Sequence, residues 1–157
     1  MRGKPPLFPM IMEVGSVILK KESGSLIPNR RGREGNQMRF LIVDNQPRAR
    51  QSMKALLGAW YKGEEAREAA NGVEALHLVE EFQPDLVLMD VRMPKIDGLE
   101  ALRRIKSKHR QVKVIVLSMY PDYEAEALAA GADAFVSKSD PPEKFRKALL
   151  EVIRHIN

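Results

Sequence analysis

The sequence predicts an α/β domain in which five strand–helix units build a parallel sheet. From Met38 onward, short apolar runs alternate with amphipathic segments about ten residues long, the pattern of a repeated βα unit. Of the 157 residues, 44% are hydrophobic and 30% are charged, which is typical of a globular protein. The chain has no Cys, which excludes disulfides, thiolate zinc sites and cysteine nucleophiles and fits a reducing, cytoplasmic location.

Residues 1–37 differ from the rest in composition. They contain four Pro and five Gly, and seven basic against three acidic residues, so they carry +4 of the net charge of +5. We expect a basic, poorly ordered extension over 1–37 and one domain over 38–157, with a natural start at Met38 as the alternative. The near-neutral domain gives little support for DNA binding. The apolar stretch 7–19 is too short to span a bilayer, so no membrane contact is expected.

The first half of the domain is expected to hold two strands and two helices. The apolar run 39–43 is the first strand, and residues 48–60 have the apolar spacing of an amphipathic helix. A weaker strand lies at 65–69. The second helix, 72–82, follows an Asn-Gly turn and ends before a proline. Its side chains expected to face inward are Val73, Leu76, Val79 and Phe82.

The second half is expected to hold three strands and three helices. Residues 85–90 form a continuous apolar run with an acid at each end, which indicates a central strand buried on both faces. A glycine at position 131 is a good helix C-cap, and two prolines open the last helix. The other elements expected are, in order, a helix over 98–108, a strand over 113–117, a helix over 123–130, a strand over 134–137 and a helix up to about 155.

Polar residues stand at the carboxyl ends of four predicted strands. They are Asp44 and Asn45, Asp90, Ser118, and Lys138. Ligands of open parallel sheets bind beyond the carboxyl ends of the strands. Residues far apart in the sequence should therefore converge at one edge of the sheet.

The motifs around these strand ends are FLIVDNQP, PDLVLMDVRMPKIDGLE, VIVLSMY and GADAFVSKSD. They resemble the receiver domain of response regulators, over residues 38–157. The segments LSMY and LEALRRI are similar to those of its NarL/FixJ-type branch. The resemblance implies a doubly wound, flavodoxin-like or CheY-like sheet in the order 2-1-3-4-5. Whether the chain is a stand-alone receiver or a truncated regulator stays open.

The resemblance also implies a phosphoryl-transfer site with Mg²⁺ as its cofactor. Asp90 would accept the phosphoryl group and become an aspartyl phosphate. The metal would be held by Asp44, Asn45, Asp90 and the backbone carbonyl of Arg92. Such a cation prefers an octahedral shell of oxygen ligands.

Two further residues would contact the transferred phosphoryl group, and two others would transmit the resulting conformational change to the output face. By resemblance, the ammonium of Lys138 and the hydroxyl of Ser118 hold phosphoryl oxygens. Ser118 would shift inward together with Phe135, the aromatic residue of the fifth strand. Tyr120 would lie beside the output face formed by residues 123–130, the fifth strand and the last helix.

One position departs from the family, which usually has two adjacent acids after the first strand where this chain has Asp44 and Asn45. The site then has two carboxylates in place of three. Losing one close Coulomb interaction costs roughly 1 to 3 kcal/mol. This corresponds to about tenfold to hundredfold in affinity, so Mg²⁺ binding should be weaker than usual for the family.

The leading hypothesis is a two-component switch that a sensor histidine kinase phosphorylates on Asp90, with a downstream protein or a second copy as the output partner. At most a slow autodephosphorylation is expected, so the chain is not an enzyme in the ordinary sense. The alternative is a degenerate receiver that binds partners constitutively without cycling phosphate, which Asn45 favours. A dehalogenase-type phosphatase needs a second acid two residues after the nucleophile, and Arg92 occupies that position.

Overall fold

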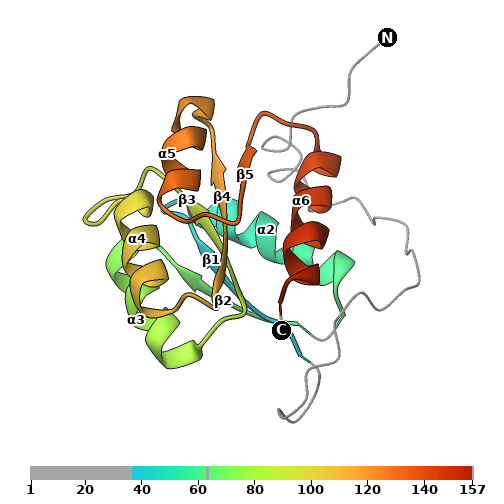
Figure 1. Ribbon diagram of the computed structural model, residues 1–157. Coiled ribbons are helices and arrows are strands. Elements are labelled where there is room, and N and C mark those ends of the chain that lie inside the picture. The colour runs from blue at the N-terminus through green and yellow to red at the C-terminus, as the bar shows by residue number, and fades with distance from the viewer. Residues whose placement is uncertain (1–36, 63, 157) are drawn as a thin grey trace.

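The computed structural model describes residues 37–62 and 64–156. The predicted N-terminal extension lies outside the described residues except for Gln37. Figure 1 shows a single twisted sheet with helices packed on both of its faces. The described part of the chain contains no helix that is both long enough and apolar enough to cross a membrane.

The sheet has five strands: β1 (Arg39–Val43), β2 (Glu65–Ala69), β3 (Leu86–Asp90), β4 (Lys113–Ser118) and β5 (Ala134–Ser137). All neighbouring strands are parallel, and their order is β2-β1-β3-β4-β5. The predicted order is therefore confirmed. Because β1 and β3 are neighbours and the chain leaves them toward opposite edges, the crevice between their carboxyl ends is the switch point of the fold.

The helices divide between the two faces of the sheet. On one face lie α2 (Pro47–Trp60) and α6 (Pro142–Arg154), and on the other lie α3 (Gly72–Phe82), α4 (Gly98–Lys108) and α5 (Glu124–Ala129). A short 3₁₀ turn, η1 (Pro121–Tyr123), precedes α5. The helix predicted over 123–130 is thus shorter than expected, with its first turn wound more tightly.

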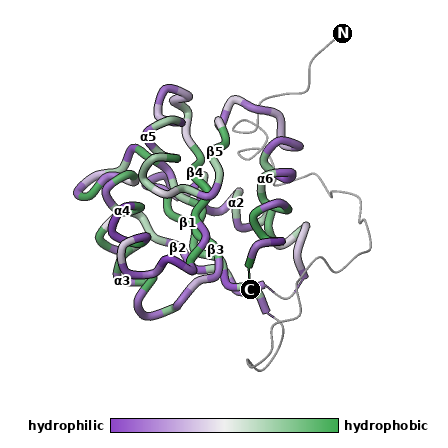
Figure 2. Tube along the Cα trace, viewed as in Figure 1, coloured by the Kyte–Doolittle hydropathy of each residue, from purple (hydrophilic) through white to green (hydrophobic). Residues whose placement is uncertain are grey.

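Two apolar cores result because successive strand residues point to opposite faces. In β1, Phe40 and Ile42 face α2 and α6, whereas Leu41 and Val43 face α3 and α4. Figure 2 shows the apolar residues gathered along the strands and the inner helix faces. This double burial explains why the central strands are almost wholly apolar until their last residues.

Side-chain caps begin α3 and α4. Asn71 accepts a hydrogen bond from the Glu74 amide at the start of α3, and Asp97 accepts one from the Glu100 amide at the start of α4. One inward-facing prediction was wrong, because Val73 is 47% exposed. Ala75 is buried in its place, since the buried stripe of α3 continues through Val79.

Candidate functional site

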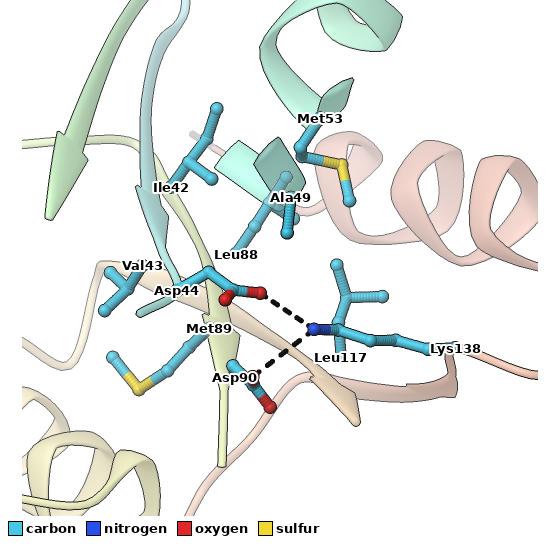
Figure 3. Close-up of a pocket in the computed structure, with 10 residues that line it drawn as sticks. All are labelled: Ile42, Val43, Asp44, Ala49, Met53, Leu88, Met89, Asp90, Leu117 and Lys138. Atoms are coloured by element: carbon cyan, nitrogen blue, oxygen red, sulfur yellow. Dashed lines mark hydrogen bonds and ion pairs between the residues drawn. The ribbon is translucent and has the colours of Figure 1, made fainter. Parts of the chain in front are cut away.

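The predicted strand-end residues meet at one edge of the sheet. Asp90 ends β3 and pairs in register with Leu117 of β4, and Ser118 pairs with Ser137 of β5. Asp44 and Lys138 directly follow β1 and β5. Figure 3 shows the side chains of Asp44, Asp90 and Lys138 pointing toward one another.

The centre of the site is an ion-paired triad. The Nζ atom of Lys138 lies 2.7 Å from Oδ2 of Asp44 and 3.3 Å from Oδ2 of Asp90. Lys138 is 5% exposed and Asp44 is 6% exposed. Burying charge is costly unless it is paired, so each of the three groups depends on the others.

Three further contacts fix Asp44. Its second carboxylate oxygen, Oδ1, accepts a hydrogen bond of 2.9 Å from the Gln46 amide. Its own amide donates to the Ala69 carbonyl of β2 at 3.1 Å, and its carbonyl accepts from the Arg50 guanidinium at 2.7 Å. Sequence reasoning missed Arg50, because no pattern in the sequence shows that a helical arginine reaches a backbone carbonyl.

Asp90 is held at the entrance of the loop between β3 and α4. Its Oδ1 accepts from the Val91 amide at 2.8 Å. Burial raises the pKa of Asp90, the charge of Lys138 lowers it, and the charge of Asp44 raises it. The balance favours a proton more than for an exposed aspartate, and the charge of Lys138 opposes this effect of burial.

Gly98 shapes the same loop by allowing two backbone segments to touch. A Cβ atom at this position would lie 2.0 Å from the carbonyl oxygen of Asp90. The Gly98 amide donates to the Val91 carbonyl at 2.8 Å. Only glycine permits this approach, which ties the start of α4 to the residue after Asp90.

Ser118 adjoins the triad through its backbone. It is fully buried, and its carbonyl accepts from the Lys138 amide at 2.8 Å. Its Oγ accepts from the Tyr120 amide at 3.0 Å, which leaves its hydroxyl hydrogen to be donated elsewhere. Phe135 is partly buried against the α4 and α5 side of the core.

Asn45 and Arg92 lie away from the triad, on the exposed rim. Both line an open concavity of about 510 Å³ next to the β3–α4 loop. The Arg92 guanidinium stacks 4.0 Å above the Tyr120 ring and donates to its hydroxyl at 3.2 Å. Tyr120 is 42% exposed and meets Tyr123 edge to face.

The oxygen ligands of the site suit a hard cation, although the site has few negative charges. Asp44 and Asp90 provide two carboxylates on neighbouring strands. Among residues 37–62 and 64–156, no group of three or more acidic, His or Cys side chains is placed to hold a metal ion. Carboxylate oxygens suit Mg²⁺, which these two acids would hold together with carbonyl oxygens and water, and Asn45 would add no charge to the site.

The comparisons with known proteins agree with this geometry. Residues 40–150 match the family model described as the response regulator receiver domain. The uncharacterized transcriptional regulatory protein YhcZ of Bacillus subtilis is 38% identical over 112 residues, covering 70% of this chain and 52% of that protein. The nitrate/nitrite response regulator NarL of Escherichia coli is 34% identical over 112 residues, with the same shares.

One similar solved structure is a complex with Mg²⁺ and BeF. The response regulator TrrA of Thermotoga maritima, crystallised with Mg²⁺ and BeF, is 34% identical and superposes with a TM-score of 0.67 over 73% of this chain and 98% of that chain. The curated relatives are longer, and this chain spans about half of their length.

Proposed function

This chain belongs to the response regulator receiver family, and on that premise we propose that it is a phosphorylation-dependent signalling switch. Asp90 accepts a phosphoryl group from a sensor histidine kinase in a Mg²⁺-dependent reaction. The observation that carries the proposal is the contact of Lys138 with both Asp44 and Asp90 at the switch point of the sheet.

The transfer uses Asp90 as an oxygen nucleophile. Its carboxylate oxygen forms a bond to phosphorus while the bond from phosphorus to the donor's histidine nitrogen breaks, and that nitrogen leaves with the electron pair. The Val91 amide holds the other oxygen, Oδ1, and so orients the carboxyl group. Bound Mg²⁺, with Asp44, Asp90, the Arg92 carbonyl and Asn45 as its proposed holders, would neutralise charge on the phosphoryl oxygens.

The new charge is read by residues that already surround Asp90. Lys138 turns its ammonium toward a phosphoryl oxygen, and Ser118 donates the hydroxyl hydrogen that Tyr120 leaves available. Because the Lys138 amide bonds to the Ser118 carbonyl, the ends of β4 and β5 move together. The change then reaches Phe135, Tyr120 and the face of α5, β5 and α6, where a downstream protein or a second copy binds.

Intact-mass measurement tests the phosphoacceptor. The chain is incubated with acetyl phosphate and Mg²⁺, beside an Asp90→Asn variant. We expect one phosphoryl group on the unmodified chain and none on the variant. No mass gain on the unmodified chain, or an equal gain on the variant, contradicts the assignment of Asp90.

The second candidate is a degenerate receiver that binds its partner constitutively. Asn45 favours it, because the remaining two acids are already paired with Lys138. Beryllofluoride with Mg²⁺ separates the two functions. Shifts of the Asp90, Ser118 and Lys138 amide resonances support the switch, whereas an unchanged spectrum supports the constitutive module.

A further inference from the structure

Arg50, in the first turn of α2, braces three elements at once. Its guanidinium donates to the Asp44 carbonyl at 2.7 Å through Nη1, and to Oε1 of Glu68 at 3.3 Å through Nε. Glu68 belongs to β2 and precedes Ala69, whose carbonyl receives the Asp44 amide. Both sides of the Asp44 backbone are therefore anchored to the β2 edge, one directly and one through Arg50.

The location of this arginine is unfavourable for the helix itself. The first turn of α2 has no acidic residue, and Arg48 and Arg50 both stand at its positive end. The N-cap, Gln46, makes no capping bond with its side chain. Helix stability does not account for Arg50, whereas its two contacts do. Its side chain is only 15% exposed, so the guanidinium is held in one place.

The brace bears on the direction of the Asp44 carboxylate. The Asp44 carbonyl belongs to the peptide that links it to Asn45, and the next amide along, that of Gln46, holds Oδ1 of Asp44 at 2.9 Å. A rotation of the peptide after Asp44 would break that bond and turn the carboxylate away from Lys138. Arg50 opposes the rotation because it holds the carbonyl oxygen.

We propose that Arg50 is a positioning residue of the phosphorylation site, which sets the orientation of Asp44 for the metal by bridging the Asp44 carbonyl and Glu68. The inference rests on the proposed function for the role of the metal. The bridge needs the planar fork of arginine, with one nitrogen for each oxygen, and a lysine ammonium at the end of a flexible stem does not reproduce it.

Charge and positioning predict opposite effects on the metal, which makes the proposal testable. Arg50→Met removes a positive charge near the site, so electrostatics alone predicts tighter Mg²⁺ binding. Loss of a supporting contact predicts weaker binding, by roughly tenfold or more. Arg50→Lys keeps the charge, so electrostatics alone predicts no change, and positioning again predicts weakening.

The experiment titrates the full chain with Mg²⁺ by calorimetry, in unmodified protein, Arg50→Met, Arg50→Lys and the control Lys54→Met. Lys54 lies one turn further along α2 and also approaches Glu68, at 3.9 Å, without a hydrogen bond to Asp44. We expect roughly tenfold weaker binding in both Arg50 variants and unchanged binding in the control. Equal or tighter binding by Arg50→Met overturns the proposal.

A second readout does not depend on the metal or on phosphorylation. The Gln46 amide should exchange with deuterium several-fold faster in both Arg50 variants than in Lys54→Met, while the Leu88 amide in β3 reports that the fold is intact. Unchanged Gln46 exchange overturns the proposal even if the metal affinity falls. A chain that takes up no phosphoryl group refutes the proposed function alone, because the exchange result still decides whether Arg50 positions Asp44.

Discussion

Replacing Asn45 by Asp should strengthen Mg²⁺ binding. The ion-paired triad has a net charge of −1, because Lys138 offsets one of the two carboxylates. Asn45 is exposed and lies on the rim beside the loop that follows Asp90. A carboxylate at this position adds a third acid without burying a new charge.

The size of the effect follows from Coulomb's law in a solvent-like medium. Two unit charges about 4 Å apart in water interact by about 1 kcal/mol, so a divalent cation and one carboxylate interact by about 2 kcal/mol. Since 1.4 kcal/mol is a factor of about ten, we expect roughly thirtyfold tighter binding. Because position 45 is exposed, the gain should shrink as the salt concentration rises.

Calorimetric titration with Mg²⁺ measures this difference, with Asn45→Ala as the control. The alanine variant removes the amide oxygen, and so reports whether Asn45 is itself a ligand. An Asn45→Asp variant that binds Mg²⁺ no more tightly than the unmodified chain refutes the reasoning, because it would mean that the cation lies too far from position 45 to sense its charge.

Four further changes test the packing and the charges of the domain. Gly98→Ala should destabilise the fold by about 1 to 3 kcal/mol, because its Cβ would collide with the Asp90 carbonyl. Gly58→Ala, exposed in the last turn of α2, should instead stabilise it by up to about 1 kcal/mol, because the Glu64 carboxylate, 3.1 Å from the new Cβ, is the end of a flexible side chain and can move aside. Urea unfolding measures both. Burial raises the pKa of Asp90, so stability falls as the pH rises from about 3.9, the value of an unfolded aspartate, to the higher native value. Asp90→Asn should remove that decline. Parallel profiles of unfolding free energy against pH for the two proteins would show that Asp90 does not cause it. Burial, partly offset by Arg146, raises the pKa of Tyr61 to about 12, so stability should fall between pH 10 and 12 and Tyr61→Phe should abolish this loss.

The fold was predictable because apolar residues recur with clear and different spacings in its strands and its helices. The five strands agree with the predicted ranges to within a residue at each end, and the helices over 72–82 and 98–108 agree completely. The miss at Val73 has a local cause. The stripe through Leu76 and the stripe through Ala75 differ by one residue, and a small alanine gives a weak hydropathy signal although it packs closely against the sheet.

The site was predictable only at the level of which strand ends converge. Parallel topology brings Asp44, Asp90 and Lys138 together whatever their side-chain rotamers. That Lys138 bridges both acids depends on side-chain length and direction, which strand periodicity does not specify. The Arg50 contact was harder still, since a backbone carbonyl acceptor leaves no trace in residue identity.

The triad makes Lys138 both a competitor and a helper of the proposed chemistry. Its ammonium occupies the space between the two acids that would hold the metal, so a dication and Lys138 repel each other there. A phosphoryl group on Asp90 would add negative charge for both cations to contact, and would draw Lys138 toward a phosphoryl oxygen and away from Asp44. On the proposed function, Mg²⁺ would therefore favour the phosphorylated state and phosphorylation would favour Mg²⁺ binding, and by linkage the two equilibria would shift by the same factor. Because Asn45 stands in place of a third acid, this mutual dependence should be stronger than in a receiver with three acids, whose site has enough negative charge to bind Mg²⁺ before phosphorylation.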